Sequence, residues 1–220
     1  MRYCTLLMDF DGTLFDTRQA IRLTLAQLTE RRGVAAFEGA AVDAVIDQGL
    51  ALAPMLRRLV PEGNAGLLEE WIADYRSLYN GGLGVAHSAP YPGVEAVLQH
   101  AQHHGIELFI VSNKGLASVL VSLEHYRLRH YFREVIAAVD ERPPKPQPAS
   151  FLAQIQPLIG HQSSEQVLVV GDTEVDLHYA RNIGAPSCWA AYGYGQAAAA
   201  QGLSPDFVIQ APQDLLQIMR

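Results

Sequence analysis

Cysteine is scarce in this chain: 220 residues include two, Cys4 and Cys188. Each lies in a separate apolar run, and the pair lacks the spacing of a metal site. We therefore interpret both as buried structural thiols, because free cysteines are often buried like small apolar residues. A reducing cytoplasm fits this usage, and we expect the protein to be cytoplasmic.

The chain also has fewer basic than acidic residues and lacks long apolar runs. The formal net charge is −7, and Lys114 and Lys145 are the two lysines among 16 basic residues. Nucleic-acid binding depends on clustered basic side chains, so we expect no nucleic-acid partner. No apolar run approaches the ~20 residues that span a bilayer, and Asp9 and Asp11 interrupt the first one, which argues against a signal peptide. We expect no membrane partner, and either a monomer or a homodimer.

Apolar residues are abundant: they make up 49% of the chain, against 18% charged residues. That is enough for a sizeable core. Short apolar runs alternate with amphipathic helical patterns, an order typical of an α/β fold with a doubly wound parallel sheet. Three runs are almost continuously apolar, as expected for strands buried on both faces. The predicted strands are Thr5–Met8, Ile106–Val111, Glu134–Ala137, Gln166–Val170, Ser187–Ala190 and Phe207–Ile209.

One long stretch lacks strand patterns. Between residues 15 and 84 the apolar residues follow helical spacing, which predicts an all-α insert directly after the first strand. The return segment, 81–93, is rich in glycine and proline and is typical of a hinge or linker. We predict a catalytic core made of residues 1–14 and 85–220, with residues 15–84 as a helical cap domain.

Polar residues follow four of the predicted strands. In open parallel sheets, ligands bind beyond the carboxyl ends of the strands. The sequence therefore predicts one polar rim, supplied by four strand ends. In chain order these residues are Asp9 and Asp11, then Ser112, Asn113 and Lys114, then Lys145 in a proline-rich loop, then Gly171-Asp172-Thr173-Glu174-Val175-Asp176.

The carboxylates of this set suit phosphoryl transfer. A phosphoryl group is negatively charged, so an anionic nucleophile such as Asp9 needs strong positive charge beside it. Crowded carboxylates repel one another unless a hard cation neutralises them, and Mg²⁺ prefers oxygen ligands. We predict Asp9 and Asp172 as direct magnesium ligands, with Asp176 reaching the site directly or through water.

The other polar residues have complementary predicted roles. Lys145 is expected to balance the charges of the phosphate and of Asp9. Asp11 is expected to act as general acid toward the leaving group and then as general base toward water. Gly12 allows a tight turn beside them, and helix-start amides are expected to help hold phosphate oxygens. The predicted phosphate-binding residues are Ser112, Asn113, Lys145 and Gly12.

Each motif also has a structural interpretation when it is taken alone. A lone Asp-x-Asp-Gly-Thr is often a turn, Ser112-Asn113 can cap a helix, and Lys145 in a proline-rich loop can be a solvated surface charge. All four motifs fall in order at successive strand ends, and this combination favours catalysis.

Together these motifs resemble the haloacid dehalogenase superfamily, and specifically its phosphoglycolate-phosphatase-like branch. The matching residues are Asp9-Phe10-Asp11-Gly12-Thr13, Ser112, Lys145 and Gly171 to Asp176, with further similarity through 91–94 and 111–114. The resemblance covers nearly the whole chain. It implies a Rossmann-like core, with the helical insert in the place of the family's small cap domain. It also implies that residues 48–50 belong to the loop that reaches down onto substrate.

The resemblance further implies an aspartyl-phosphate intermediate on Asp9 and acid/base action by Asp11. One Mg²⁺ would be held by Asp9, the backbone carbonyl of Asp11 and Asp172, with support from Asp176. Dehalogenases of this superfamily need neither Asp11 nor Asp172, which argues against that activity. Phosphonate hydrolysis uses a cap lysine, and residues 15–84 contain none.

We therefore expect hydrolysis of a small phosphate monoester, such as phosphoglycolate. Two alternatives stay open. A phosphotransferase or mutase acting on a sugar phosphate shares every core motif, and a non-catalytic phosphate-binding module can keep the same fold.

Overall fold

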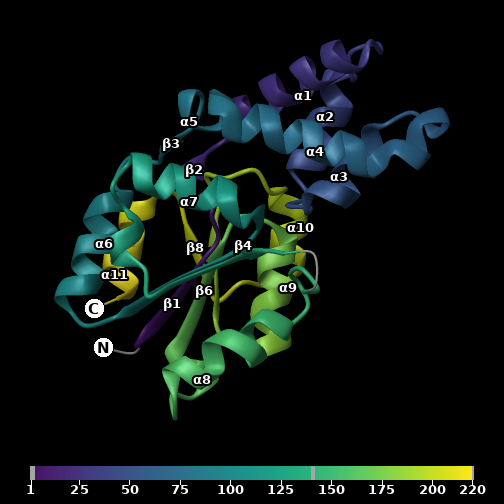
Figure 1. Cartoon of the computed structure of the whole chain (residues 1–220). Helices are drawn as coiled ribbons and strands as arrows, with labels where there is room; N and C mark the ends of the chain where they lie inside the picture. Colours follow the sequence, from purple (N-terminus) through teal and green to yellow (C-terminus); the bar gives the residue numbers. More distant parts are fainter. Residues whose placement is uncertain (1–2, 140–141, 220) are drawn as a thin grey trace.

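Six parallel strands form the central sheet of the computed structural model, which describes residues 3–139 and 142–219. The order across the sheet is β5-β4-β1-β6-β7-β8, so the first strand lies inside it (Figure 1). All neighbouring pairs run parallel. All six predicted strands are present. They are β1 (Thr5–Met8), β4 (Glu107–Gly115), β5 (Glu134–Ala138), β6 (Val167–Gly171), β7 (Ser187–Ala190) and β8 (Phe207–Ile209).

Successive residues of β1 contribute to two different hydrophobic cores. Leu6 and Met8 pack with helices on one face of the sheet, whereas Leu7 packs with helices on the other. Side chains alternate between the two faces of a strand, so a strand covered on both faces is apolar throughout. This explains the nearly continuous apolar runs, and it confirms the predicted doubly wound α/β arrangement.

Helices cover both faces of the sheet, and Figure 1 shows the two groups on opposite sides of the strands. One face carries α6 (Val94–His103), α7 (Leu116–His125) and α11 (Leu215–Ile218). The other carries the helical segment η4 (Phe151–Ile155), α8 (Gln156–Ile159) and α9 (Glu174–Ile183), and α10 (Ala197–Gly202) packs against α9. Short 3₁₀ turns are η3 (Arg129–Tyr131), η5 (Ser164–Gln166) and η6 (Pro212–Asp214).

The helical insert between β2 (Phe15–Asp16) and β3 (Ala89–Pro90) has a hydrophobic core of its own. Its elements include α1 (Arg18–Arg32), α2 (Gly39–Ile46), α3 (Leu52–Leu59), η1 (Glu62–Leu67) and α4 (Leu68–Leu78). Trp71 and Tyr75 lie one turn apart on α4 and are both buried in this core. Figure 1 shows the insert beyond one end of the sheet, the end toward which β1 runs.

The connections of the insert differ in two ways from the sequence prediction. The glycine-rich stretch predicted as a hinge or linker instead continues α4, as the wide helical segment η2 (Tyr79–Leu83) and then α5 (Gly84–Ala86). Gly82 is the residue of η2 that leaves helical geometry, with φ 136°. In addition, β2 pairs antiparallel with β3, so the segment that enters the insert is hydrogen-bonded to the segment that leaves it. Two-residue strands have no periodic pattern, so the sequence does not predict them.

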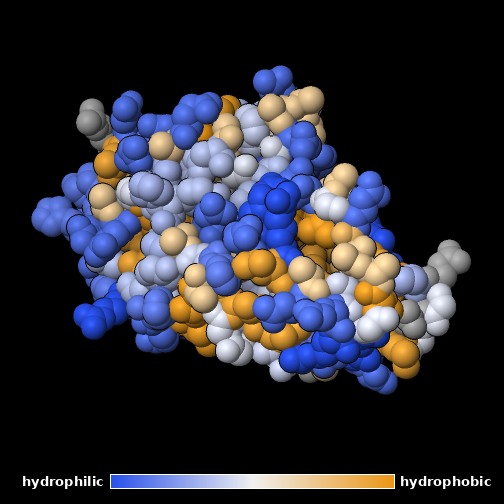
Figure 2. Space-filling model, turned by 90° about the horizontal axis from the view of Figure 1, so that it is seen from above, coloured by the Kyte–Doolittle hydropathy of each residue, from blue (hydrophilic) through white to orange (hydrophobic). Residues whose placement is uncertain are grey.

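The surface of the described residues carries scattered apolar side chains. Leu152 on η4, Val121 on α7 and Val208 on β8 are among the most exposed of them. On the face seen from above, apolar side chains gather toward one side and are interrupted by strongly hydrophilic ones (Figure 2). Single exposed apolar side chains such as Leu152 are ordinary on protein surfaces. Across the two described ranges, no helix is long and apolar enough to cross a bilayer.

Candidate active site

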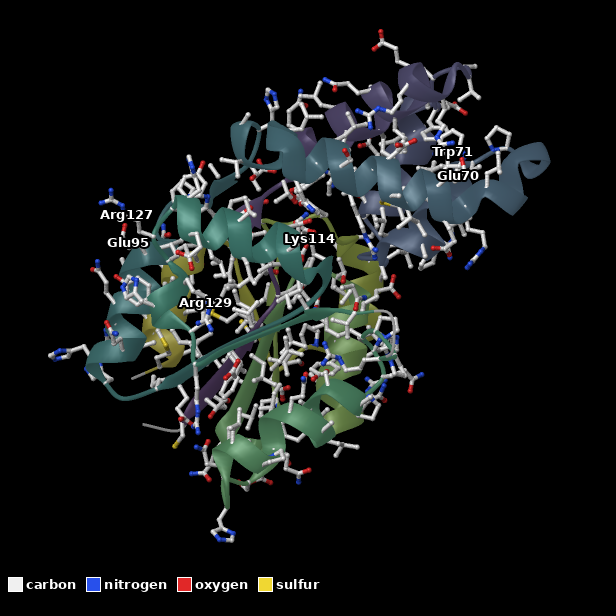
Figure 3. The ribbon with its side chains drawn as sticks, viewed as in Figure 1. Glu70, Trp71, Glu95, Lys114, Arg127 and Arg129 are labelled. Carbon is white, nitrogen blue, oxygen red and sulfur yellow. The ribbon has the colours of Figure 1, made fainter. Side chains whose placement is uncertain are left out.

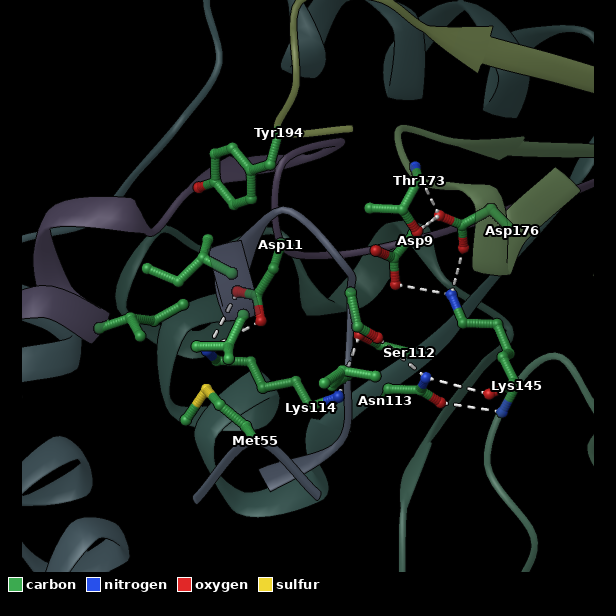
Figure 4. Close-up of a pocket in the computed structure, with 15 residues that line it drawn as sticks. Asp9, Asp11, Met55, Ser112, Asn113, Lys114, Lys145, Thr173, Asp176 and Tyr194 are labelled. Atoms are coloured by element: carbon green, nitrogen blue, oxygen red, sulfur yellow. Dashed lines mark hydrogen bonds and ion pairs between the residues drawn. The ribbon is translucent and has the colours of Figure 1, made fainter. Parts of the chain in front are cut away.

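Carboxylates and a buried ammonium meet where β1 and β6 end. Asp9 directly follows β1, and its Oδ1 accepts a hydrogen bond from Lys145 Nζ at 2.8 Å. The same Nζ lies 2.5 Å from Oδ1 of Asp176, in the first turn of α9. Figure 4 shows the ammonium between the two carboxylates. One oxygen each from Asp9, Asp172 and Asp176 all lie within 4.8 Å of one another, so the predicted acidic residues do converge.

Asp172 is the most deeply buried member of this cluster, with no exposed surface. Its Oδ1 accepts a hydrogen bond from Thr13 Oγ1 at 3.0 Å. Its Oδ2 accepts one from the Tyr194 amide at 2.7 Å, and its backbone carbonyl accepts one from Trp189 Nε1 at 2.9 Å. Asp172 is therefore fixed from three directions before any ligand arrives.

Asp176 is held by the start of its own helix. Its Oδ2 accepts hydrogen bonds from the Thr173 amide at 3.1 Å and from Thr173 Oγ1 at 2.9 Å, and the first of these belongs to the capping box at the start of α9. A carboxylate in the first helical turn is also stabilised by the helix dipole. One oxygen thus secures the helix, and the other faces Lys145.

Burial and mutual repulsion make the charged form of this cluster costly. Burial raises the pKa of Asp9 to about 6; Lys145 opposes this shift, and the nearby charges of Asp176 and Asp11 add to it. Burial also raises the pKa of Asp172 well above its usual range, and Asp176 and Asp9 raise it further. For Lys145, burial alone lowers the pKa, but the two neighbouring carboxylates outweigh it and the pKa is raised.

A divalent cation fits this donor set. Three carboxylates lie within reach of one point, and a single ammonium does not neutralise them. Hard cations such as Mg²⁺ bind such oxygen clusters, and a bound cation reverses the electrostatic cost of ionising them. Asp9, Asp172 and Asp176 are the side chains placed to hold it.

Asp11 lies beside this cluster. Its Oδ1 accepts a hydrogen bond from Thr17 Oγ1 at 2.6 Å. Lys114 Nζ lies 3.0 Å from Oδ1 and 3.1 Å from Oδ2. Asp11 lines both a small cavity of about 50 Å³ that also borders Asp9 and an adjoining cavity of about 260 Å³. It therefore stands at the boundary between the two spaces.

The residues after the second predicted strand all line the small cavity, but their side chains differ in what they bind. β4 continues past Val111 to Gly115 with a shift in its pairing with β5. Ser112 faces the cavity, and its Oγ accepts a hydrogen bond from the Lys114 amide at 3.3 Å. Asn113 instead pairs with the Lys145 backbone, at 2.9 and 3.2 Å.

Asn113 also connects the core to the insert. Its Nδ2 donates to the carbonyl of Gly49 at 3.1 Å. Gly49 and Leu50 line the small cavity, which agrees with the expectation that residues 48–50 reach the site. The geometry gives Asn113 a role in placing Lys145, and its predicted contact with phosphate stays a prediction.

Gly12 occupies the turn, with its amide donating to the Phe15 carbonyl at 2.8 Å. It is absent from the described lining of the small cavity, so its predicted phosphate contact also stays a prediction. Its requirement for glycine is structural. Its φ is +76°, and an added Cβ would lie 2.1 Å from Asp172 Oδ2.

Gly12→Ala is therefore expected to destabilise the fold and to displace Asp172. Left-handed strain alone costs about 1 kcal/mol or more, and the clash adds to that. Gly33→Ala is the matched control, because Gly33 has φ +64° with open space around an added Cβ. Urea unfolding is expected to show a larger loss for Gly12→Ala than for Gly33→Ala. Equal losses would contradict the clash with Asp172.

Comparison with known proteins decides the family. A family model described as haloacid dehalogenase-like hydrolase matches residues 6–190. The chain belongs to the haloacid dehalogenase-like hydrolases. A phosphoglycolate phosphatase of Aquifex aeolicus is 27% identical over 214 residues, with 97% of this chain and 95% of that protein covered. The pyrophosphatase PpaX of Halalkalibacterium halodurans is 27% identical over 219 residues, covering 100% and 98%.

The fold of this hydrolase is shared with solved structures. A haloacid dehalogenase-like family hydrolase of Streptococcus pneumoniae superposes with a TM-score of 0.83 at 21% identity, and the match covers 99% of each chain. The expected superfamily is therefore confirmed, and so is the expected enzyme class, a hydrolase with curated phosphatase relatives.

Sequence reasoning missed Tyr194, which supports the site of this dehalogenase-like hydrolase from the loop after β7. Its backbone amide donates a hydrogen bond to Asp172, and its hydroxyl accepts hydrogen bonds from the amides of Thr17 at 2.6 Å and Arg18 at 2.9 Å, at the start of α1. The sequence signal was the pair of flanking glycines: an added Cβ on Gly193 or Gly195 would lie within 2.2 Å of Asp172 atoms. The alternation Gly-Tyr-Gly indicates such close approach of backbone.

Magnesium is expected to raise the melting temperature of this hydrolase more at neutral than at acid pH. The pKa values of Asp9 and Asp172 are higher in the folded protein than in the unfolded chain. The protonated carboxyl groups therefore stabilise the fold below the unfolded pKa, and this stabilisation is lost as the pH rises through about 6 for Asp9 and through the raised pKa of Asp172. Mg²⁺ competes with those protons. The measurement is thermal unfolding with Mg²⁺ or with EDTA, at about pH 5 and about pH 7.5. An equal gain at both pH values would contradict cation binding at these carboxylates.

Proposed function

We propose that this chain is a magnesium-dependent phosphatase that hydrolyses a small phosphate monoester through an aspartyl-phosphate intermediate on Asp9. The observation that carries the proposal is the position of Asp9. Its carboxylate faces the small cavity, accepts a hydrogen bond from the buried Lys145 ammonium at 2.8 Å, and lies beside two further carboxylates. An anionic nucleophile attacking a phosphate ester needs positive charge beside it, and here the Lys145 ammonium and a cation bound by the carboxylates would supply that charge.

The metal ligands in this proposal are Asp9 and Asp172, with Asp176 beside them and the backbone carbonyl of Asp11 as implied by the family resemblance. When bound, Mg²⁺ supplies charge neutralisation for the phosphoryl oxygens and for the crowded carboxylates. The contribution of Lys145 is separate: its ammonium holds Asp9 in the attacking orientation and offsets part of the negative charge.

Two displacements complete the proposed reaction. In the first, an Asp9 carboxylate oxygen forms a bond to phosphorus while the bond from phosphorus to the leaving oxygen breaks. The Asp11 carboxyl gives its proton to that leaving oxygen. In the second, the Asp11 carboxylate takes a proton from water as the water oxygen bonds to phosphorus and the bond from phosphorus to the Asp9 oxygen breaks. Inorganic phosphate leaves, Asp9 is restored, and Asp11 is protonated again.

We further propose that residues 15–84 act as a cap over this chemistry. Gly49, Leu50 and Met55 of the insert line the small cavity, and Asn113 bonds the Gly49 carbonyl. An insert in this place excludes bulk water and adds contacts to the substrate, as lids generally do.

The adjoining cavity indicates the chemical class of the leaving group. Its lining includes Arg76 on α4 and Arg142, together with the ion pair of Lys114 with Asp11. Arginine side chains in such a lining suit a small leaving group that is itself an anion, because the guanidinium group binds carboxylates well. Phosphoglycolate has such a group in its carboxylate, and the names of the curated relatives agree with a small anionic substrate.

Phosphate release from a small substrate panel tests this function. With Mg²⁺ present, phosphoglycolate is expected to be hydrolysed with a higher kcat/KM than glycerol phosphate, whose leaving group is neutral. Arg76→Gln is expected to raise KM for phosphoglycolate by about tenfold, which is the loss of about 1.4 kcal/mol of binding. Arg57→Gln on the exposed side of α3 is the matched control. No preference for the carboxylated ester would contradict the assignment of the leaving group.

The two alternatives have distinct signatures in the same experiment. Conversion of a sugar phosphate to its isomer without free phosphate would replace hydrolysis by a mutase reaction. Failure to release phosphate from every ester in the panel would favour a phosphate-binding module without catalysis. The complete set of catalytic side chains at the strand ends supports hydrolysis over that module.

A further inference from the structure

Lys114 is a buried ammonium outside the cluster that surrounds Asp9. It lies near the end of β4, and 8% of its side chain is exposed. Figure 3 shows it at the junction between the sheet and the insert. Its Nζ lies almost equally far from both carboxylate oxygens of Asp11, at 3.0 and 3.1 Å. This two-point contact fixes the rotation of the Asp11 carboxylate as well as its position.

An aromatic ring of the insert lies against the same ammonium. Lys114 Nζ is 4.1 Å from the ring centroid of Tyr79, at the start of η2, and 6.0 Å from that of Phe10. Tyr75 stacks on Tyr79 with ring centroids 5.9 Å apart. The Tyr79 hydroxyl is buried and makes no hydrogen bond among the described residues, so the face of the ring is the contact that the geometry supports. A desolvated cation over such a ring is stabilised.

A buried ion pair of this kind is weak evidence for stability. Removing two charges from water costs about as much as their attraction returns, and apolar side chains of similar size often do as well. The Asp11 carboxylate, 3.0 and 3.1 Å from the Lys114 ammonium, offsets the cost of burying that charge. The ammonium is therefore kept charged in a place where charge is expensive, and a functional reason is needed.

The position of Asp11 explains why a charged side chain is kept there. Asp11 borders both cavities, and the other hydrogen bond described for its side chain comes from the Thr17 hydroxyl at 2.6 Å. Without Lys114, one hydrogen bond to Oδ1 leaves the carboxyl free to rotate about its axis. A proton donor has to point at the leaving oxygen, because proton transfer requires hydrogen-bond distance.

We propose that Lys114 is the positioning residue for the acid/base group Asp11, and that the ring of Tyr79 holds the Lys114 ammonium in place. The proposal rests on the proposed phosphatase function. Lys114 touches neither phosphorus nor the leaving oxygen; it acts through Asp11. As the Asp11 carboxyl gives its proton to the leaving oxygen, negative charge develops on the carboxylate, and a preorganised ammonium stabilises that charge.

The test compares two substrates whose leaving groups differ in their need for a proton. p-Nitrophenolate leaves without one, whereas the glycolate alkoxide of phosphoglycolate requires it. Lys114→Gln is expected to lower kcat/KM for phosphoglycolate by about 10²-fold, and to lower that for p-nitrophenyl phosphate by much less. The ratio of the two values does not depend on the fraction of folded enzyme, so partial unfolding of the variant does not imitate the result. Lys114→Arg, which keeps the charge, is expected to restore part of the ratio.

Three further variants separate positioning from other roles. In an Asp11→Asn background, Lys114→Gln is expected to change the ratio no further, because its effect passes through Asp11. An additional loss there would show that Lys114 binds the substrate directly and would overturn the proposal. Tyr79→Phe keeps the ring and is expected to keep the wild-type ratio, whereas Tyr79→Leu removes the ring and is expected to lower the ratio.

The possible failures are distinguishable. A wild-type protein that releases no phosphate from either ester would overturn the phosphatase function, and this proposal with it. An active wild type whose Lys114→Gln variant loses activity equally on both esters, or loses none, would overturn the positioning role alone.

Discussion

Asp9→Asn is expected to lower phosphate release by ~10⁴-fold or more, as removal of an enzymatic nucleophile does. An amide does not attack phosphorus, so no aspartyl phosphate forms. The Lys145 ammonium can still bond the amide oxygen, and binding of phosphate esters is expected to persist. Steady-state phosphate release and equilibrium binding of phosphoglycolate measure the two effects separately.

The same substitution is expected to leave the metal-free fold as stable as the wild type at neutral pH, or more stable. The charged form of Asp9 is opposed by burial and by its acidic neighbours, which is why its pKa is raised to about 6. A neutral amide avoids that cost. Asp16→Asn is the matched control, because Asp16 is exposed and the amide keeps the acceptor oxygen that bonds the Tyr194 hydroxyl at 3.1 Å. Wild-type turnover in Asp9→Asn would refute the assignment of the nucleophile.

Lys145→Met is expected to damage both activity and stability. It removes the ammonium that lies 2.8 Å from Asp9 and 2.5 Å from Asp176. Removing one partner of a buried ion pair costs about 3–5 kcal/mol, because the other charge is left buried and uncompensated. The pKa of Asp9 is then expected to rise further, so less of this proposed nucleophile is ionised near neutral pH. We expect kcat to fall by ~10³-fold, comparable to loss of one strong electrostatic contact at a reacting group.

The stability loss of Lys145→Met depends on pH in a defined direction. A carboxyl group whose pKa is higher in the folded protein than in the unfolded chain destabilises the fold increasingly as the pH rises from the unfolded value through the folded one. The difference in unfolding free energy from wild type is therefore expected to be larger at about pH 7.5 than at about pH 5. Lys145→Arg keeps the charge and is expected to retain most of the stability. A pH-independent difference from wild type would show that packing, and not charge, is what Lys145 contributes.

The central sheet and the acidic cluster were predictable because both follow from local patterns. A strand such as β1 is buried on two faces and therefore appears as a continuous apolar run, whatever lies around it. Asp9, Lys145 and Asp172 each follow such a run or lie in the loop after it, and the parallel sheet brings its strand ends together. The topology of the sheet is therefore enough to predict that these residues converge.

The features that the sequence did not reveal depend on contacts between distant segments. Tyr194 bonds Asp172 and the start of α1 through one backbone amide and one hydroxyl, and no periodic pattern encodes such a pairing. The glycines around Gly82 suggested a flexible hinge by composition. The packing of η2 and α5 against α7 keeps them helical, a tertiary effect that local propensity does not report.

The crowding of carboxylates around Asp172 has a practical consequence for engineering. Asp172 is fully buried beside two other acids, and its pKa is raised well above its usual range. A screen of metal-free variants for heat resistance is therefore expected to select neutral replacements of these three carboxylates first, since each replacement relieves the repulsion among them. If these carboxylates act as proposed, selection for thermostability alone is expected to enrich inactive proteins, because a site preorganised for function is often locally unfavourable to folding. On the proposed function, directed evolution of this chain has to include a turnover assay at every round.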